Sequence, residues 1–228
     1  MSKLYIVATP IGNLEDITLR ALRILREVDF ILCEDTRVTK KLLSKYEITT
    51  QTISYHQHSG EVKTNKIIEL LKKEKSLALV TDAGTPGISD PGNKLITDLI
   101  KEIGGGVEVI PIPGPSALSA SLSISGFPTD QFLFLGFLPH KKGRQTMINE
   151  IARSKQTVIV YESCHRIEKF LEQLLGAGGQ NLKLTVCREL TKMFESIYRG
   201  SPTQVLQELQ FNKKNLKGEF VVVISHNA

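Results

Sequence analysis

The segment that decides the fold is LYIVATPIGNLEDITLRALRILREVDFILCEDTR, residues 4–37. It begins with an apolar, β-branched run, continues with apolar residues at helical spacing over 18–28, and ends with a second apolar run at 30–33. This order of an apolar run, an amphipathic helix and another apolar run predicts two parallel strands joined by a helix.

The same alternation continues through the first half of the chain. We expect strands at 4–8, 30–33, 77–81 and 107–110, and helices at 18–28, 36–46, 92–103 and 116–125. The proline-rich segment 111–115 is expected to end the last of these strands, because proline donates no hydrogen bond to a sheet and restrains the residue before it. We therefore expect a hinge there, between domains 1–112 and 113–228.

The second half predicts a different kind of sheet. We expect strands at 132–137, 157–161, 182–187, 194–198 and 220–225, and helices at 144–152, 167–175 and 203–209. The connection 188–193 is too short for a helix, so the strands on either side of it should pair antiparallel. The fold class expected is α/β with two α/β domains, the first sheet mainly parallel and the second mixed.

Composition limits the class of protein. The chain has 228 residues, of which 41% are apolar and 23% charged, which excludes disordered, collagen-like and small disulfide-rich proteins. Its apolar runs are far shorter than the roughly 20 residues of a membrane-spanning helix, and its N-terminus does not resemble a secretory leader. Cys33, Cys164 and Cys187 are widely spaced and odd in number, which favours reduced thiols. We expect a cytoplasmic protein with no membrane partner.

The net charge of +5 is unevenly distributed along the chain. Residues 1–118 hold 15 basic and 15 acidic residues, whereas residues 119–228 hold 14 and 9. An excess of this kind can attract a polyanion such as RNA, although an ordinary solvated surface explains it almost equally well. Arg20, Arg23 and Arg26 are interpreted as the solvated face of the first helix.

Four loops are expected at the carboxyl ends of strands, where open α/β sheets bind ligands: 9–13, 34–37, 82–92 and 111–117. The third, DAGTPGISDPG, has three glycines, two prolines and two aspartates, and exposes backbone groups to a ligand. It lacks both common phosphate-binding glycine motifs and carries carboxylates instead of a lysine. A ligand with hydroxyls, an adenine ring and a positive centre fits better, which points to S-adenosylmethionine.

Several motifs together resemble one family. They are TPIGNLEDITLRAL (9–22), CEDTR (33–37), TDAGTPGISDPG (81–92), PGPSA (113–117), GFLP (136–139), YESCHRI (161–167), RELTKMFE (188–195) and GEFVVVI (218–224). In this order they resemble the bacterial 16S ribosomal RNA (cytidine-2′-O)-methyltransferase family of the tetrapyrrole-methylase superfamily, the class III S-adenosylmethionine-dependent methyltransferases. The similarity extends over essentially the whole chain.

The resemblance implies an enzyme that transfers a methyl group from S-adenosylmethionine to a cytidine ribose of 16S rRNA. Because the chain is only mildly basic, we expect it to act on the assembled 30S subunit. The resemblance also implies a homodimer and a cofactor folded in the cleft between the two domains. The cofactor-binding residues that it implies are Pro10, Ile11, Gly84, Thr85, Pro86, Ile88, Asp90, Ser116, Ala117, Tyr161, Glu162, Leu190 and Val221.

The sequence differs from its relatives in the superfamily in two ways. Thr85 occupies the position where porphyrin-modifying cousins carry aspartate, and the ribosomal branch shares this threonine. Many members of that branch continue into a small C-terminal helical extension, whereas this sequence ends at Ala228. If that extension helps the relatives to hold RNA, we expect this chain to use another surface or a partner instead. Cys164, where relatives often have proline or threonine, is given no chemical role.

Transfer to a hydroxyl needs a positioned nucleophile and a group that accepts its proton or stabilises the developing charge. The catalytic candidates are Glu189 and Lys192, and further candidates are Glu195, Asp35 and Arg37. Each of them could instead form a salt bridge that anchors its loop. Expected RNA contacts are Arg37, Lys141, Lys142, Arg144, Lys213 and Lys214. His56 and His58 alternate as in a strand, but without a third ligand we expect no metal.

Two other functions stay open at this point. The same fold could methylate a tetrapyrrole such as uroporphyrinogen or a precorrin, although Thr85 and RELTK disfavour this. The chain could also be a module that binds S-adenosylmethionine without activity.

Overall fold

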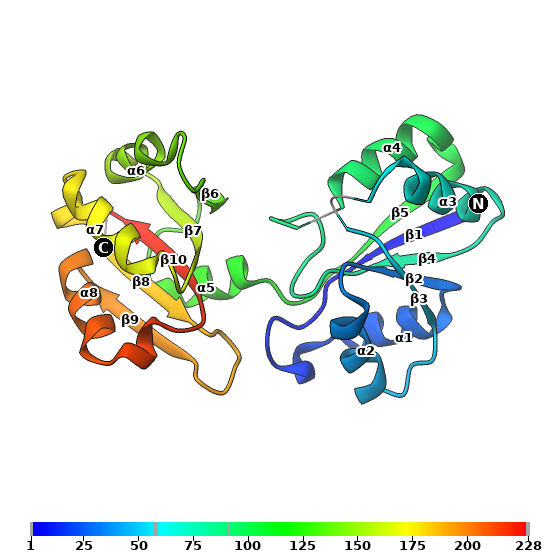
Figure 1. The fold of residues 1–228 in the computed structure, drawn as a ribbon, viewed down its shortest axis with the longest axis horizontal. Coiled ribbons are helices and arrows are strands. Elements are labelled where there is room, and N and C mark those ends of the chain that lie inside the picture. The colour runs from blue at the N-terminus through cyan, green and yellow to red at the C-terminus, as the bar shows by residue number, and fades with distance from the viewer. Residues whose placement is uncertain (1, 57–58, 91, 227–228) are drawn as a thin grey trace. The chain divides into compact units, whose positions relative to one another are not determined.

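A computed structural model describes residues 2–56, 59–90 and 92–226 (Figure 1). The chain divides into two compact units, Met1–Ser116 and Ala117–Ala228, called here the first and second units. Each has its own five-stranded sheet and its own apolar core.

The sheet of the first unit is entirely parallel, in the strand order β3-β2-β4-β1-β5. Its strands are β1 (Ser2–Val7), β2 (Phe30–Cys33), β3 (Gln51–Ser54), β4 (Leu77–Leu79) and β5 (Val107–Ile112). The apolar runs at residues 4, 30 and 77 become the inner strands because both faces of a parallel sheet are covered by helices. The expected parallel α/β sheet is confirmed.

Helices cover both faces of this sheet (Figure 1). One face packs against α1 (Leu19–Glu27) and α2 (Thr36–Lys45), and the other against α3 (Glu61–Lys72) and α4 (Asn93–Ile103). Two short 3-10 turns, η1 (Leu14–Asp16) and η2 (Gly104–Gly106), lie in the connections. The start of α1 follows from its sequence, since the Thr18 hydroxyl accepts the backbone N–H of Ala21 as an N-cap.

Three features of the first unit differ from the sequence analysis. Strand β3 and helix α3 were not expected, because QTIS is a short polar edge strand and α3 begins at Gly60 without a side-chain cap. The expectation that prolines end the strand at residue 110 is wrong, since β5 continues through Pro111 to Ile112. Strand β5 lies at the sheet edge and pairs only with β1, so a missing N–H is tolerated there.

The sheet of the second unit is mixed, in the order β6-β7-β10-β8-β9. Its strands are β6 (Phe132–Phe137), β7 (Thr157–Ser163), β8 (Lys183–Arg188), β9 (Ser196–Gly200) and β10 (Glu219–Ser225). Only β6 and β7 pair in parallel. The predicted antiparallel pairing across the 188–193 connection is confirmed as β8 with β9.

Alternation along the strands separates the two faces of this sheet. Phe220, Val222 and Ile224 of β10 point into a core with α6 (Arg144–Arg153), α7 (Ile167–Gly176) and α8 (Pro202–Phe211). The opposite face carries α5 (Ala117–Ser125), where the Thr185 hydroxyl donates to the Ser125 carbonyl at 3.1 Å. The 3-10 turns η3 (Gly179–Asn181) and η4 (Lys213–Leu216) precede β8 and β10.

A buried charge cluster joins the sheet of the second unit to its helices. The Glu162 side chain has no solvent exposure, and its two oxygens lie 3.0 Å from the Arg144 guanidinium and 2.7 Å from that of Arg166. Arg144 also donates to Gln173, and Arg166 to the Leu138 carbonyl. A single carboxylate therefore balances two guanidinium groups with little access to water.

We expect Glu162→Ala to lower the free energy of unfolding by about 3–5 kcal/mol, because it leaves two buried cations without a counter-charge. Urea denaturation measures this loss. The matched control is Glu27→Ala, which removes an exposed i,i+4 pair with Arg23 and should cost less than about 0.5 kcal/mol. Equal effects of the two substitutions would contradict a structural role for the cluster.

Candidate functional site

Backbone and side-chain hydrogen bonds join the four loops at the carboxyl ends of the strands in the first unit. Thr9 and Gly84 exchange two backbone hydrogen bonds, of 2.9 and 3.0 Å, as an isolated antiparallel bridge. The Thr85 hydroxyl donates to the Pro115 carbonyl at 3.2 Å, and the Asp35 N–H donates to Asp82 Oδ1 at 3.1 Å. The four loops that the sequence singled out therefore form one connected surface, called here the loop edge.

Glycine is required within the DAGTPGISDPG loop. Gly87 has a φ of 83°, and a Cβ there would lie 2.8 Å from the side-chain oxygen of Asn93. That side chain donates back to the Gly87 carbonyl at 3.1 Å, which fixes the loop against the start of α4. A larger residue would strain the backbone and displace Asn93.

The cofactor candidates of the first unit all lie in the loop edge. They are Pro10, Ile11, Gly84, Thr85, Pro86, Ile88, Asp90 and Ser116. Pro10 and Pro86 are buried, whereas the Ile88 side chain is exposed. Ala117, the neighbouring candidate, is the first residue of α5 and belongs to the second unit.

The loop edge is acidic. Glu34, Asp35 and Asp82 line an open pocket of about 550 Å³ together with Thr36, Arg37, Ser54 and His56. Burial, followed by the nearby negative charge of Glu34, raises the pKa of Asp90 to about 6. Burial and the charge of Asp82 also raise the pKa of Glu34. The raised pKa values of Asp90 and Glu34 favour a ligand that brings positive charge or hydroxyl donors to this edge.

These properties fit S-adenosylmethionine better than a phosphate ligand. The carboxylates suit a sulfonium and ribose hydroxyls, and the partly exposed Ile11 and the exposed Ile88 offer apolar surface for an adenine ring. Among the described residues, no group of three or more His, Cys, Asp or Glu side chains could hold a metal ion. His56 lines the pocket, while His58 lies outside the described residues.

In the second unit, the RELTK segment forms a tight loop after β8. Its backbone is left-handed at Glu189 (φ 52°) and Thr191 (φ 66°), which is unusual for residues other than glycine. Arg188 is buried and donates to the carbonyls of Lys217, Phe194 and Lys214 at 2.6, 2.9 and 3.0 Å. Arg188 therefore ties the RELTK loop to the turn before β10.

Both catalytic candidates take part in this arrangement. Lys192 Nζ lies 3.0 Å from Glu189 Oε1 and 2.8 Å from Glu219 Oε2. Burial lowers the pKa of Lys192, but the two carboxylates outweigh it and hold the pKa above its ordinary value. Burial likewise raises the pKa of Glu189, but the N–H of Glu219 and the Lys192 ammonium hold it below its ordinary value. Lys192 stays protonated and Glu189 ionised, so neither is prepared to act as a base near neutral pH.

Gly218 was missed in the sequence analysis, although it starts the GEFVVVI motif. A Cβ at this position would lie 2.5–2.7 Å from the side chain of Glu189, and the φ of Gly218 is 104°. Only glycine leaves room for the Glu189 carboxylate to reach the Glu219 N–H at 2.9 Å. The sequence did show a glycine directly before a predicted strand. It did not show the contact that requires this glycine, because Glu189 lies 29 residues earlier in the sequence.

The remaining cofactor candidates of the second unit fall into two groups. Val221 pairs with Tyr161 on the adjacent strand, on the α5 face of the sheet, and Tyr161 makes edge-to-face contacts with Phe134 and Phe137. Leu190, in the RELTK loop, is buried. Glu162 points to the opposite face, where both carboxylate oxygens are bound by arginines. Its side chain therefore serves the core and is not available as a cofactor wall.

The expected RNA contacts also divide. Lys141, Lys142, Lys213, Lys214 and Arg37 are exposed. Arg144 is not: its side chain is 6% exposed and is bound to Glu162, Gln173 and the Pro139 carbonyl. The interpretation of Arg144 as an RNA contact is therefore corrected, because a guanidinium buried against a carboxylate cannot reach a phosphate.

Asp90→Asn is expected to stabilise the protein above pH 6 but not at pH 4. Burial raises the pKa of folded Asp90 above its unfolded value, so its contribution to stability is complete below about pH 4 and is lost as the pH rises through 6. Since the carboxyl is only half-buried, we expect a gain on the order of 1 kcal/mol at pH 8, or about 2–4 °C in Tm. Thermal denaturation at both pH values tests this, and an equal shift at both would contradict it.

Comparison with known proteins places this chain in a family. The family described as Tetrapyrrole (Corrin/Porphyrin) Methylases matches residues 3–205. A Halalkalibacterium halodurans protein named "Ribosomal RNA small subunit methyltransferase I" is 46% identical over 98% of this chain and 76% of its own length. The protein of that name from Thermotoga maritima is 42% identical over 99% of both chains.

Solved structures share the fold. A diphthine synthase superposes with a TM-score of 0.74 at 15% identity, covering 98% of this chain and 90% of its own. A cobalt precorrin-4 methyltransferase gives 0.73 at 18% identity, covering 98% and 94%. A Thermus thermophilus uroporphyrin-III C-methyltransferase complexed with S-adenosyl homocysteine gives 0.67 at 19% identity, covering 98% and 97%.

The family match covers most of the chain, and the relatives align with nearly all of it. The chain therefore belongs to the tetrapyrrole (corrin/porphyrin) methylase family of methyltransferases.

Proposed function

We propose that this protein transfers a methyl group from S-adenosylmethionine to the ribose 2′-hydroxyl of a cytidine in 16S rRNA, on the assembled 30S subunit. The observation that carries the proposal is that relatives named as ribosomal RNA small subunit methyltransferases are 42–47% identical over 97–99% of this chain. The motifs DAGTP and RELTK, on which the resemblance to the ribosomal branch rests, occupy the loop edge and the loop after β8.

S-adenosylmethionine supplies an electrophilic methyl group on a positively charged sulfur. In the first unit, Pro10, Ile11, Ile88 and the backbone around Gly84 and Thr85 would hold it, with the carboxylates of the loop edge near its charge. Tyr161, Leu190 and Val221 remain predicted contacts from the second unit. The structural neighbour complexed with S-adenosyl homocysteine supports a cofactor of this kind.

Lys192 would lower the energy of the developing negative charge on the 2′-oxygen while that oxygen bonds to the methyl group and the hydroxyl proton passes to solvent water. Its ammonium is held by two carboxylates and stays charged, so it offers a fixed positive centre. Glu189 would position Lys192 instead of removing a proton, because its pKa is low and its Oε1 already accepts two hydrogen bonds.

We also propose a cytoplasmic location and a homodimer. Free thiols at Cys33, Cys164 and Cys187 agree with a reducing compartment. In the described part of the chain, no helix combines the length and apolar character needed to cross a bilayer. Sedimentation velocity over a range of concentrations would test the homodimer.

Incubation with methyl-labelled S-adenosylmethionine and 30S subunits lacking the modification is expected to label 16S rRNA at a cytidine ribose. Nuclease digestion followed by mass spectrometry of the nucleosides locates the label. Label on the base, or on protein alone, would overturn the proposal. Methylation of uroporphyrinogen or a precorrin would favour a tetrapyrrole substrate, and cofactor binding without transfer to any of these would indicate a module that binds but does not react.

Lys192→Met is expected to lower kcat by about 10²–10³-fold, as for the loss of one fixed charge-stabilising group, while S-adenosylmethionine still binds. Single-turnover methylation and calorimetry measure the two properties. The control is Lys217→Met, which changes an exposed lysine of the adjoining turn that forms no ion pair with Glu189 or Glu219 in the described part of the chain. An unchanged kcat for Lys192→Met would remove Lys192 from the mechanism.

A further inference from the structure

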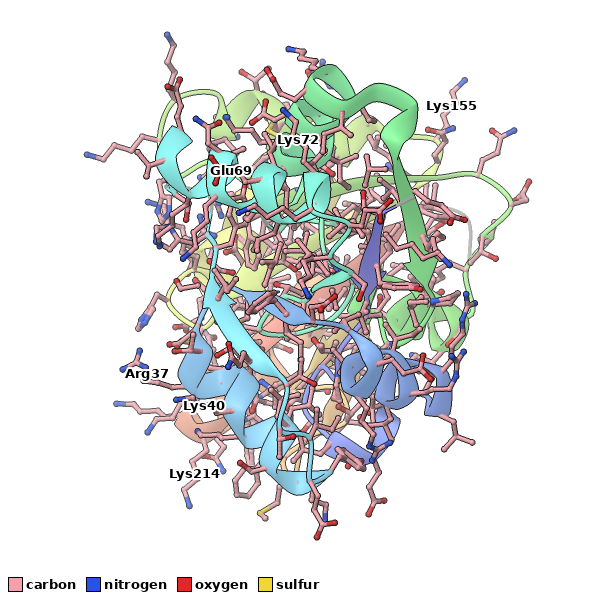
Figure 2. All side chains as sticks on the ribbon, turned by 90° about the vertical axis from the view of Figure 1, so that its right-hand side faces the viewer. Arg37, Lys40, Glu69, Lys72, Lys155 and Lys214 are labelled. Carbon is pink, nitrogen blue, oxygen red and sulfur yellow. The ribbon has the colours of Figure 1, made fainter. Side chains whose placement is uncertain are left out.

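Helix α2 carries an unusual distribution of charge. Its sequence TRVTKKLLSK contains Arg37, Lys40, Lys41 and Lys45 and no acidic residue. All four cations are exposed, while Thr39, Leu42 and Leu43 face the core. The cations therefore share the outer face of the helix, called here the α2 basic face, and Figure 2 shows Arg37 and Lys40 extending away from the ribbon.

Most of this charge is not neutralised locally. Arg37 pairs with Asp35 at 2.7 Å, but in the described part of the chain no ion pair involves Lys40, Lys41 or Lys45. The neighbouring helix α1 adds Arg20, Arg23 and Arg26 against the single acid Glu27. Arg26 donates to the Tyr46 carbonyl at 3.1 Å, so it extends the α2 basic face at the C-terminal end of α2.

Helix stability does not explain this arrangement. Arg37 and Lys41, and Lys41 and Lys45, are like charges four residues apart on the helix, which destabilises it. Arg37 also lies in the first turn, where the helix dipole disfavours a cation. By contrast, α3 intersperses Lys63, Lys66 and Lys72 with Glu61 and Glu69, the usual solvated pattern (Figure 2).

The position of α2 connects its charge to the candidate site. The helix starts directly after Glu34 and Asp35, at the loop edge, and Arg37 lines the 550 Å³ pocket there. From Arg37 to Lys45 the helix rises by about 12 Å, which is long enough to contact roughly three consecutive phosphates of one RNA strand. A strand lying along the α2 basic face would therefore reach the loop edge at the Arg37 end.

We propose that the α2 basic face binds the phosphate backbone of the RNA substrate and leads it to the loop edge of the first unit. The inference rests on the proposed function, since it takes the substrate to be 16S rRNA. It assigns RNA binding to Lys40, Lys41 and Lys45 in the half of the chain whose total charge is neutral. The partner is RNA because an unpaired cation series along one helix matches a regularly spaced polyanion.

The test is the triple variant Lys40→Gln, Lys41→Gln and Lys45→Gln. The matched control is Lys63→Gln, Lys66→Gln and Lys72→Gln on α3, which removes the same charge from the other face of the sheet. Filter binding to naked 16S rRNA and to 30S subunits is measured from 50 to 200 mM salt, together with the methylation kinetics. Thermal melts check folding, and the α2 variant should be as stable as the wild type or slightly more so.

We expect the α2 variant to bind naked 16S rRNA and 30S subunits about 10-fold more weakly and to raise KM with kcat unchanged. The slope of log K against log salt should fall by about 2–3, or 0.7–0.9 for each lost phosphate contact. The α3 variant should retain the wild-type slope and KM.

Three results would overturn the inference: a wild-type slope in the α2 variant, an equal loss in the α3 variant, or weaker binding only to 30S subunits, which would indicate a protein partner. Failure of the proposed function appears separately, as absence of rRNA methylation by the wild type. If the wild type does not methylate rRNA, the salt dependence of RNA binding by the two variants still tests the role of α2.

Discussion

The site in the first unit depends on a pair of backbone hydrogen bonds between Thr9 and Gly84. They join the loop after β1 to the loop after β4, and the Thr85 hydroxyl extends the connection to Pro115 after β5. Each of these loops is rich in proline or glycine and has few apolar side chains with which to hold its own shape. The parallel sheet brings their starts together, and the hydrogen bonds then fix them as one surface.

The two units stabilise their polar loops by different means. The first unit uses backbone pairing and glycine conformations, and at its edge burial, followed by the nearby charge of Glu34, raises the pKa of Asp90. The second unit uses buried arginines: Arg188 holds three carbonyl groups, while Arg144 and Arg166 enclose Glu162. Acidic residues that stay uncompensated suit a cationic ligand, whereas fully paired charges serve the architecture.

The net charge of each half of the chain says less about binding than the places that its charged residues take in the fold. Residues 1–118 are neutral in total, yet four of their carboxylates lie together at the loop edge and seven of their 15 basic residues lie on α1 and α2. In the second half, which has the positive net charge, Arg144 and Arg188 are buried. A count of charges along the sequence therefore pointed to the wrong residue at Arg144 and passed over Lys40, Lys41 and Lys45.

The sequence alone determined the α/β class, most strand and helix positions, the antiparallel return at β8 and β9, and the four loops that form the edge. These are local properties, because apolar period, turn residues and short connections act over a few residues. The sequence did not predict strand β3 or the continuation of β5 through Pro111, because an edge strand needs less apolar character and fewer hydrogen bonds. Only the tertiary structure decided the burial of Arg144, the need for glycine at position 218 and the separation of charge, because each depends on residues brought together from distant parts of the chain.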